Sequence, residues 1–156
     1  MLLFTRILLL LQHMKANVCD SMHSKSISIL GNLDEIHELL EDTRATMFTL
    51  RSARYNEHIR SRIEEWERRL ALLSSTLNCW QACQRGWLYL EHIFAGQDMQ
   101  RQMPAETRLF GIVDRAWHDL MRRTQDHTNA LQAATRPGVL QMLQVFFVIF
   151  SSCCVA

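Results

Sequence analysis

Residues 59–87 read IRSRIEEWERRLALLSSTLNCWQACQRGW, and this stretch decides the fold. Its large side chains recur alternately four and three residues apart, which is the spacing of a heptad repeat, for four repeats. The positions on this seam are Ile59, Ile63, Trp66, Leu70, Leu73, Leu77, Trp80, Gln84 and Trp87. The spacing predicts one long α-helix with its seam turned towards partner helices.

The tryptophans on the seam indicate what kind of partner it meets. An indole is too bulky for the tight alternation of β-branched and leucine side chains in a dimeric coiled coil. Outside the seam, Glu64 precedes Arg68 by four residues, as Glu65 does Arg69, an orientation that supports a solvated helix face by about 0.2–0.5 kcal/mol per pair. The long helix is therefore expected to pack in a bundle.

Further helix signals lie on both sides. Asn32 followed by Glu35 is a capping pattern, so a helix is expected from about Leu33. Pro104 suits the first turn of another helix. The three-and-four spacing continues there through Phe110, Val113, Trp117 and Leu120. A short helix is expected at 129–134, and a last one from Pro137 after a cap at Thr135. The predicted fold class is all-α, an elongated helical bundle with one long heptad-patterned helix.

Composition narrows the functional classes. The chain has 156 residues, about one ordinary domain. Its 17 Lys and Arg against 16 Asp and Glu leave no basic excess, so no nucleic-acid partner is expected. Five cysteines in no framework spacing favour a reducing, intracellular compartment. The apolar run 1–11 is interrupted by Arg6 and falls short of the ~20 residues of a membrane span, so membrane association is not expected.

No catalytic motif is found. No glycine pair has the spacing of a phosphate-binding loop, and no GxSxG or catalytic cysteine signature is present. The segment 37–41, HELLE, resembles a helical zinc motif, but Glu41 stands where the second His is needed. Cys79 and Cys83 lie one turn apart without a second ligand pair and are interpreted as buried free thiols. We therefore predict no catalytic residue, cofactor or metal site, and core tryptophans in preference to a stacking platform.

An ordered set of motifs carries a family resemblance. Residues 87–94 read WLYLEHIF, 98–106 read DMQRQMPAE, 113–117 read VDRAW and 134–138 read ATRPG. In this order and spacing they resemble the linker segment of dynein heavy chains, and axonemal chains more than the cytoplasmic one. The resemblance covers about Leu30 to Leu143.

The resemblance implies a mechanical role. In that family the linker is a stack of helical bundles lying across the ATPase ring, and its bending drives movement towards microtubule minus ends. Nucleotide chemistry and microtubule binding belong to segments further along those chains. The implied partners are other heavy-chain segments, with dynein intermediate or light chains as further candidates, and the implied location is the cytoplasm and cytoskeleton, in the ciliary axoneme for an axonemal chain. No enzyme activity and no direct microtubule contact are implied for these residues.

The end of the sequence departs from the family pattern. Residues 145–156, VFFVIFSSCCVA, carry no charge where the family continues with a charged amphipathic helix. We expect three parts: a lead-in at 1–31, poorly ordered or partly helical, a linker segment at 32–144, and a divergent apolar tail from a truncated or short form. The tail predicts poor solubility, and Cys153 begins a weak C-a-a-X lipidation motif. A free-standing helical interaction module is the alternative.

Overall fold

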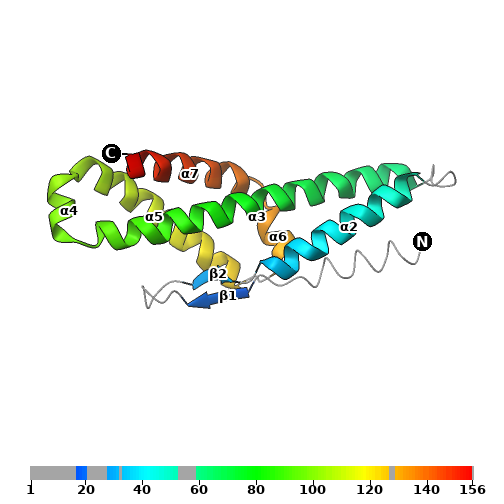
Figure 1. Cartoon of the computed structure of the whole chain (residues 1–156), viewed down its shortest axis with the longest axis horizontal. Coiled ribbons are helices and arrows are strands. Elements are labelled where there is room, and N and C mark those ends of the chain that lie inside the picture. Colours follow the sequence, from blue (N-terminus) through cyan, green and yellow to red (C-terminus); the bar gives the residue numbers. More distant parts are fainter. Residues whose placement is uncertain (1–16, 21–27, 32, 53–58, 127–128, 156) are drawn as a thin grey trace.

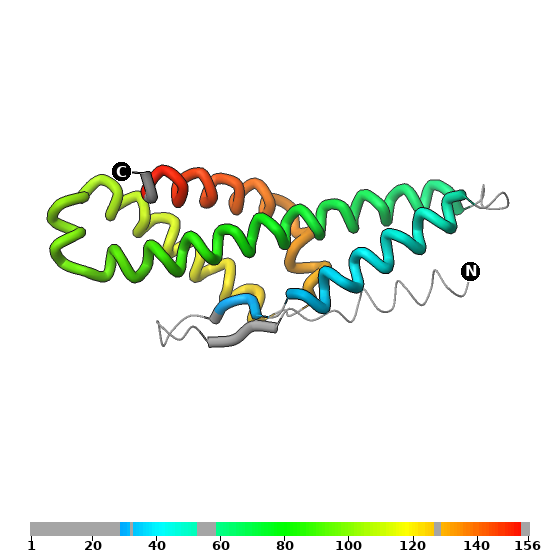
Figure 2. The backbone as a smooth tube through the Cα atoms, viewed as in Figure 1, coloured from blue at the N-terminus to red at the C-terminus, as the bar shows by residue number. Residues whose placement is uncertain are grey.

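The computed structural model describes residues 17–20, 28–31, 33–52, 59–126 and 129–155. The described part is elongated and mainly helical (Figure 1; Figure 2), which confirms the predicted all-α class. Its elements in chain order are β1 Asn17–Asp20, β2 Ser28–Gly31, α2 Asp34–Ser52, α3 Arg60–Phe94, α4 Gln97–Gln102, α5 Pro104–Asp126, α6 Ala130–Ala134 and α7 Val139–Val155.

Helix α3 is the axis of the molecule. It is 35 residues long, which at 1.5 Å per residue spans about 52 Å, and it is the long helix that the heptad seam predicted. Helix α2 packs along its first half and α7 along its second half (Figure 1). The α2–α3 contact and the α3–α7 contact are therefore made by one continuous helix.

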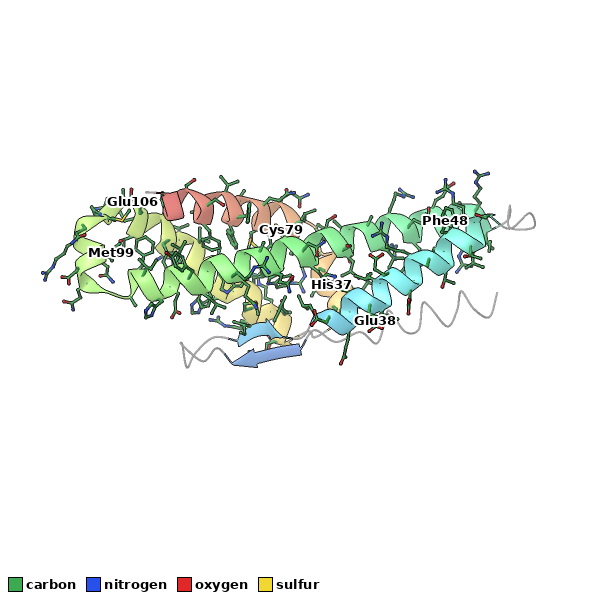
Figure 3. The ribbon with its side chains drawn as sticks, in the orientation of Figure 1. His37, Glu38, Phe48, Cys79, Met99 and Glu106 are labelled. Atoms are coloured by element: carbon green, nitrogen blue, oxygen red, sulfur yellow. The ribbon has the colours of Figure 1, made fainter. Side chains whose placement is uncertain are left out.

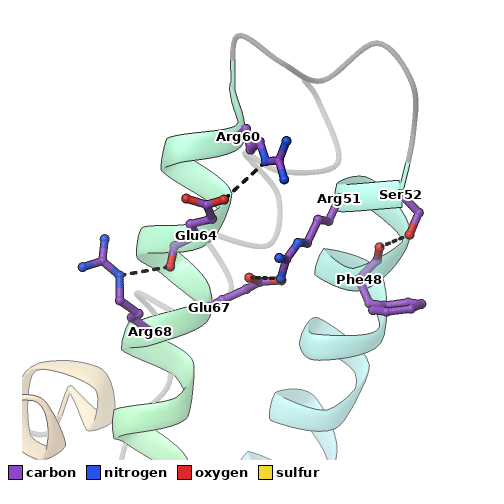
Figure 4. A network of polar contacts seen from close by, with 7 residues as sticks. All are labelled: Phe48, Arg51, Ser52, Arg60, Glu64, Glu67 and Arg68. Atoms are coloured by element: carbon purple, nitrogen blue, oxygen red, sulfur yellow. Dashed lines mark hydrogen bonds and ion pairs between the residues drawn. The ribbon is translucent and has the colours of Figure 1, made fainter.

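Exposed polar contacts lie at the end of the α2–α3 pair where α2 ends and α3 begins. Arg51 on α2 reaches Glu67 on α3 at 3.2 Å (Figure 4). Arg60 pairs with Glu64 at 3.4 Å within α3. Exposed ion pairs contribute about 0–1 kcal/mol each, so the apolar seam dominates the energetics of this pair.

The α3–α5 hairpin is closed by α4, a short helix that Gly96 precedes. The Gln100 side-chain amide donates to the carbonyl oxygen of Phe94 at 3.0 Å and so caps the end of α3. Pro104 begins α5, as predicted, because a helix's first residue needs no N–H donor. Helix α5 then returns antiparallel to α3.

The turn between α6 and α7 corrects one expectation. The short helix predicted at 129–134 is α6, and Asn129 caps it, its side chain accepting from the Gln132 amide at 2.9 Å. Thr135, however, ends α6, and its hydroxyl donates back to the Leu131 carbonyl instead of capping the next helix. Helix α7 begins at Val139 and not at Pro137, because Gly138 has a φ of +87°, a conformation that breaks the helix and favours glycine.

Two short strands lie in the lead-in predicted at 1–31, of which 1–16 and 21–27 lie outside the described residues. Strands β1 and β2 pair antiparallel, with Asn17 opposite Gly31. The pair is fixed to α3 by Gln84, whose amide oxygen accepts from the Leu30 N–H and whose amide nitrogen donates to the Leu30 carbonyl, both at 2.8 Å. The single polar member of the heptad seam thus satisfies the edge of a strand.

Helix α7 runs without a break across the boundary predicted between 144 and 145. Its apolar run is helical, and Leu143, Phe146 and Phe150 are buried with the rest of the core. Among the described residues, none of the helices combines the length and the apolar character that crossing a membrane requires.

Candidate packing site

The side chains predicted to form the seams lie inside the molecule, with one exception. The buried members are Ile59, Ile63, Leu70, Leu73, Leu77, Trp80, Trp87, Phe110, Val113, Trp117 and Leu120. Trp66 is only partly buried and packs at the margin of the core, with the Arg69 guanidinium 5.2 Å from its ring centre. At this level α2 is the neighbour of α3, and α5 and α7 lie further along it (Figure 1), so the indole is covered less completely.

A pair of tryptophans joins α3 to α5. The rings of Trp87 and Trp117 stack with centroids 5.9 Å apart and an interplanar angle of 16°. The Trp87 indole N–H donates to the Asp114 carboxylate at 2.9 Å, and the same carboxylate oxygen lies 3.4 Å from Nε2 of His118. The sequence predicted burial of both rings but gave no signal for the role of Asp114.

An aromatic cluster joins α7 to this hairpin. Phe94 stacks on Phe110 at 5.2 Å, Phe110 meets Phe150 at 6.4 Å, and Phe150 meets Phe146 at 6.3 Å. Phe150 also lies against Gly86 of α3, where an added Cβ would come within 3.3 Å of it. Sequence reasoning missed Phe146 and Phe150 because an all-apolar run has no period from which a buried face can be identified.

Two indole N–H groups in the core differ from that of Trp87. Nε1 of Trp80 and Nε1 of Trp117 are buried and have no hydrogen-bond acceptor within the described part of the chain. An unsatisfied buried donor costs about 1–3 kcal/mol. The apolar surface of these rings therefore stabilises the fold, and their polar atoms do not.

Cys83 sits at the α3–α7 contact. Its thiol is buried and donates to the Leu143 carbonyl at 3.0 Å. Burial, reinforced by the neighbouring Cys79, raises the pKa of the Cys83 thiol from 9.0 to about 12. Cys79 is partly buried, and both are free thiols, so a protonated, weakly nucleophilic Cys83 is the state at neutral pH.

The raised pKa of Cys83 predicts that the stability of the chain depends on pH in the alkaline range. The unfolded thiol ionises near pH 9.0 and the folded one near pH 12, so its contribution is complete below pH 9 and is lost as the pH rises from 9 to 12. We expect the difference in unfolding free energy between the parent chain and Cys83→Ala to narrow from pH 8 to pH 10.5 in urea titrations. A difference that is independent of pH would contradict the prediction.

No site for a metal ion emerges from the described residues, in which no group of three or more His, Cys, Asp or Glu side chains has a suitable arrangement. His37 and Glu38 lie on α2 (Figure 3), and Glu41 follows on the same helix. The acidic side chains that complement the helix dipole are Asp34 and Glu35 in the first turn of α2, and Glu38 and Glu41 continue this acidic start of the helix.

Comparison with known proteins identifies the family of the chain. A family model described as "Dynein heavy chain, N-terminal region 2" matches residues 6–153. The chain belongs to the dynein heavy chain family. The matched range extends beyond the Leu30–Leu143 that the motifs covered, and it includes α7 almost to its end.

Curated dynein heavy chains include relatives of axonemal type, which confirms the predicted axonemal resemblance. The chain is 47% identical over 121 residues to dynein axonemal heavy chain 6 of Homo sapiens, covering 78% of this chain and 3% of that one. It is 37% identical over 118 residues to dynein axonemal heavy chain 12 of Mus musculus, covering 76% and 4%. It is 33% identical over 114 residues to dynein axonemal heavy chain 2 of Mus musculus, covering 73% and 3%. The chain thus spans 3–4% of the length of these dynein heavy chains.

Proposed function

We propose that this chain supplies a stiff helical segment of a dynein heavy chain linker, a mechanical element of a minus-end-directed microtubule motor. The main support for this proposal is that α3 is one continuous helix whose two halves pack against different helices. Its first half packs on α2 and its second half on α5 and α7. A continuous helix held on both halves resists bending, because every flexion must break backbone hydrogen bonds or buried contacts.

The proposal includes a setting and partners. The axonemal relatives support placement in the cytoskeleton of the cilium, and the helical seams favour other heavy-chain segments as the main partners, with intermediate or light chains as further candidates. Nucleotide hydrolysis and direct microtubule contact are assigned to other parts of the heavy chain. This segment is proposed to act without a catalytic site or cofactor of its own.

The test weakens α3 between its two halves without touching the core. Ser74 and Ser75 lie there and are not buried. Changing both to Gly costs more helix stability than changing both to Ala, by roughly 1 kcal/mol per residue. Each pair is placed in a recombinant axonemal heavy chain whose matching segment is replaced by residues 6–153 of this chain.

We expect the Gly pair to slow microtubule gliding relative to the Ala pair while ATP hydrolysis continues at a similar rate. Such uncoupling is the signature of a lever that has become flexible. Equal gliding velocities for the two pairs would contradict the mechanical role and would favour the alternative, a helical module that works only by binding other proteins.

A further inference from the structure

A strip of apolar side chains follows the junction between α5 and α7 on the outside of the molecule. Its members are Leu109, Ile112 and Ala116 on α5 and Met142, Val145 and Ile149 on α7. Leu109 is 49%, Ile112 58% and Val145 56% exposed, and the other three are partly buried against the core. Spacings of three and four residues place each trio on one face of its helix.

The two trios lie on the same flank because α5 and α7 run antiparallel in a fixed register. Phe110 packs beside Phe150 near one end, and Leu120 lines a pocket with Val139 near the other. Both Ala116 and Met142 line that pocket, so the trios meet there. From Leu109, at one end of the strip, to Arg123 in the pocket at the other, α5 rises through 14 residue steps, which is about 21 Å.

The pocket at the end of the strip adds a charge. Its volume is about 330 Å³, its floor is apolar, and Arg123 of α5 and Arg136 of the α6–α7 turn stand on its rim. Neither guanidinium has an ion-pair partner within the described part of the chain. Asp119 also lines the pocket, but its carboxylate lies 3.7 Å from the guanidinium of Arg122, the residue that precedes Arg123 on α5.

Helix α7 adds to the positive field and does not oppose it. It contains no charged residue, and its N-terminus, the positive end of its dipole, opens beside Arg136. An apolar strip of helix length with a cationic end matches an amphipathic helix that carries acidic residues in one end turn. At the opposite end of the strip the positive charge of Arg108 is accompanied by the negative charge of Glu106 on the same helix, so the two arginines at the pocket give the match its direction.

We infer that the strip formed by Leu109, Ile112, Ala116, Met142, Val145 and Ile149 is a docking surface for an amphipathic helix whose C-terminal turn is acidic. The acidic turn lies at Arg123 and Arg136, so the docked helix runs antiparallel to α7 with its negative dipole end at the cationic rim. The helix comes from another polypeptide segment. The inference deepens the proposed function, since it gives the segment a defined attachment point for a neighbouring helix.

The experiment measures binding of designed peptides to the 156-residue chain by fluorescence anisotropy. The probe is an 18-residue labelled helical peptide with Leu at positions 3, 6, 10 and 13 and Glu at 16 and 17; its control has Lys at 16 and 17. We expect the Glu peptide to bind roughly tenfold more tightly than the Lys peptide, because the charges meet at a partly desolvated rim. In the double variant R123E/R136E the preference should reverse.

Two further variants distinguish binding at the strip from non-specific binding elsewhere on the surface. Ile112→Ser with Val145→Ser should weaken both peptides, and Arg44→Glu, an exposed charge change on α2 away from the strip, should change neither. All substituted residues are at the surface or rim, and an unchanged helix content by circular dichroism verifies folding. Absence of binding, equal binding of both peptides, or a concentration-dependent dimer that Ile112→Ser abolishes would each overturn the inference. The gliding assay is independent of these outcomes, so the two proposals fail separately.

Discussion

Trp87→Ala is expected to lower the unfolding free energy of the chain by about 3–5 kcal/mol, the range found when a fully buried aromatic side chain is removed. Trp87 is fully buried, and it carries both the stack on Trp117 and the hydrogen bond to Asp114. The loss would be measured by urea unfolding followed by far-ultraviolet circular dichroism, because changes at tryptophan alter the fluorescence signal itself.

Phenylalanine substitutions divide this effect into packing and hydrogen bonding. Trp87→Phe removes the donor to Asp114 and is expected to cost about 1–3 kcal/mol. Trp117→Phe removes a buried N–H that has no acceptor among the described residues, so it is expected to cost less. A cost for Trp117→Phe equal to or above that for Trp87→Phe would show that the hydrogen bond to Asp114 does not contribute.

The regular part of the fold was predictable because its signals are periodic. The three-and-four spacing from Ile59 to Trp87 recurs often enough to define both a helix and its buried face, and Pro104 marks the start of α5 by its missing N–H. The burial of Trp80 and Trp87 follows directly. Trp66 occupies an equivalent position in the pattern but is only partly buried. Its burial depends on where the neighbouring helices lie, and the heptad spacing does not contain that information.

The remainder depends on contacts between distant residues. The inward position of Phe150 on α7 depends on the space that Gly86 leaves on α3, far away in sequence. The docking of β2 depends on a side chain that the heptad pattern marks only as an exception, Gln84. The role of Asp114 likewise requires the register of α5 on α3. Each of these features depends on a contact between two residues that only the tertiary structure brings together.

These long-range contacts concentrate on the second half of α3. Within a few turns it holds the strand pair through Gln84, α7 through Cys83 and Gly86, and α5 through Trp87. The first half of α3 has α2 as its packed partner. Resistance to unfolding should therefore be greatest around residues 80–94, and this region is the part of the helix best suited to transmit force from neighbouring segments.

Gly86→Leu is expected to displace α7 from α3 and to destabilise the chain by about 1–3 kcal/mol or more, the usual cost of overfilling a packed core. A Cβ at this position already lies 3.3 Å from two atoms of Phe150, so the rest of a leucine side chain has no room. Loss of α7 also uncovers Phe110 and Phe146, which stand in the same aromatic cluster. Unfolding free energy and binding of a hydrophobic dye report the two effects separately.

Gly111→Leu is the matched control, because it makes the same substitution in α5 where an added Cβ meets nothing within 4 Å. Replacing a helical glycine there should stabilise the chain by roughly 0.5–1 kcal/mol through helix propensity alone. Since that gain is common to both variants, the difference between them isolates the steric contact with Phe150. If Gly86→Leu proved as stable as Gly111→Leu, with no increase in dye binding, α7 could not lie against α3 at this position.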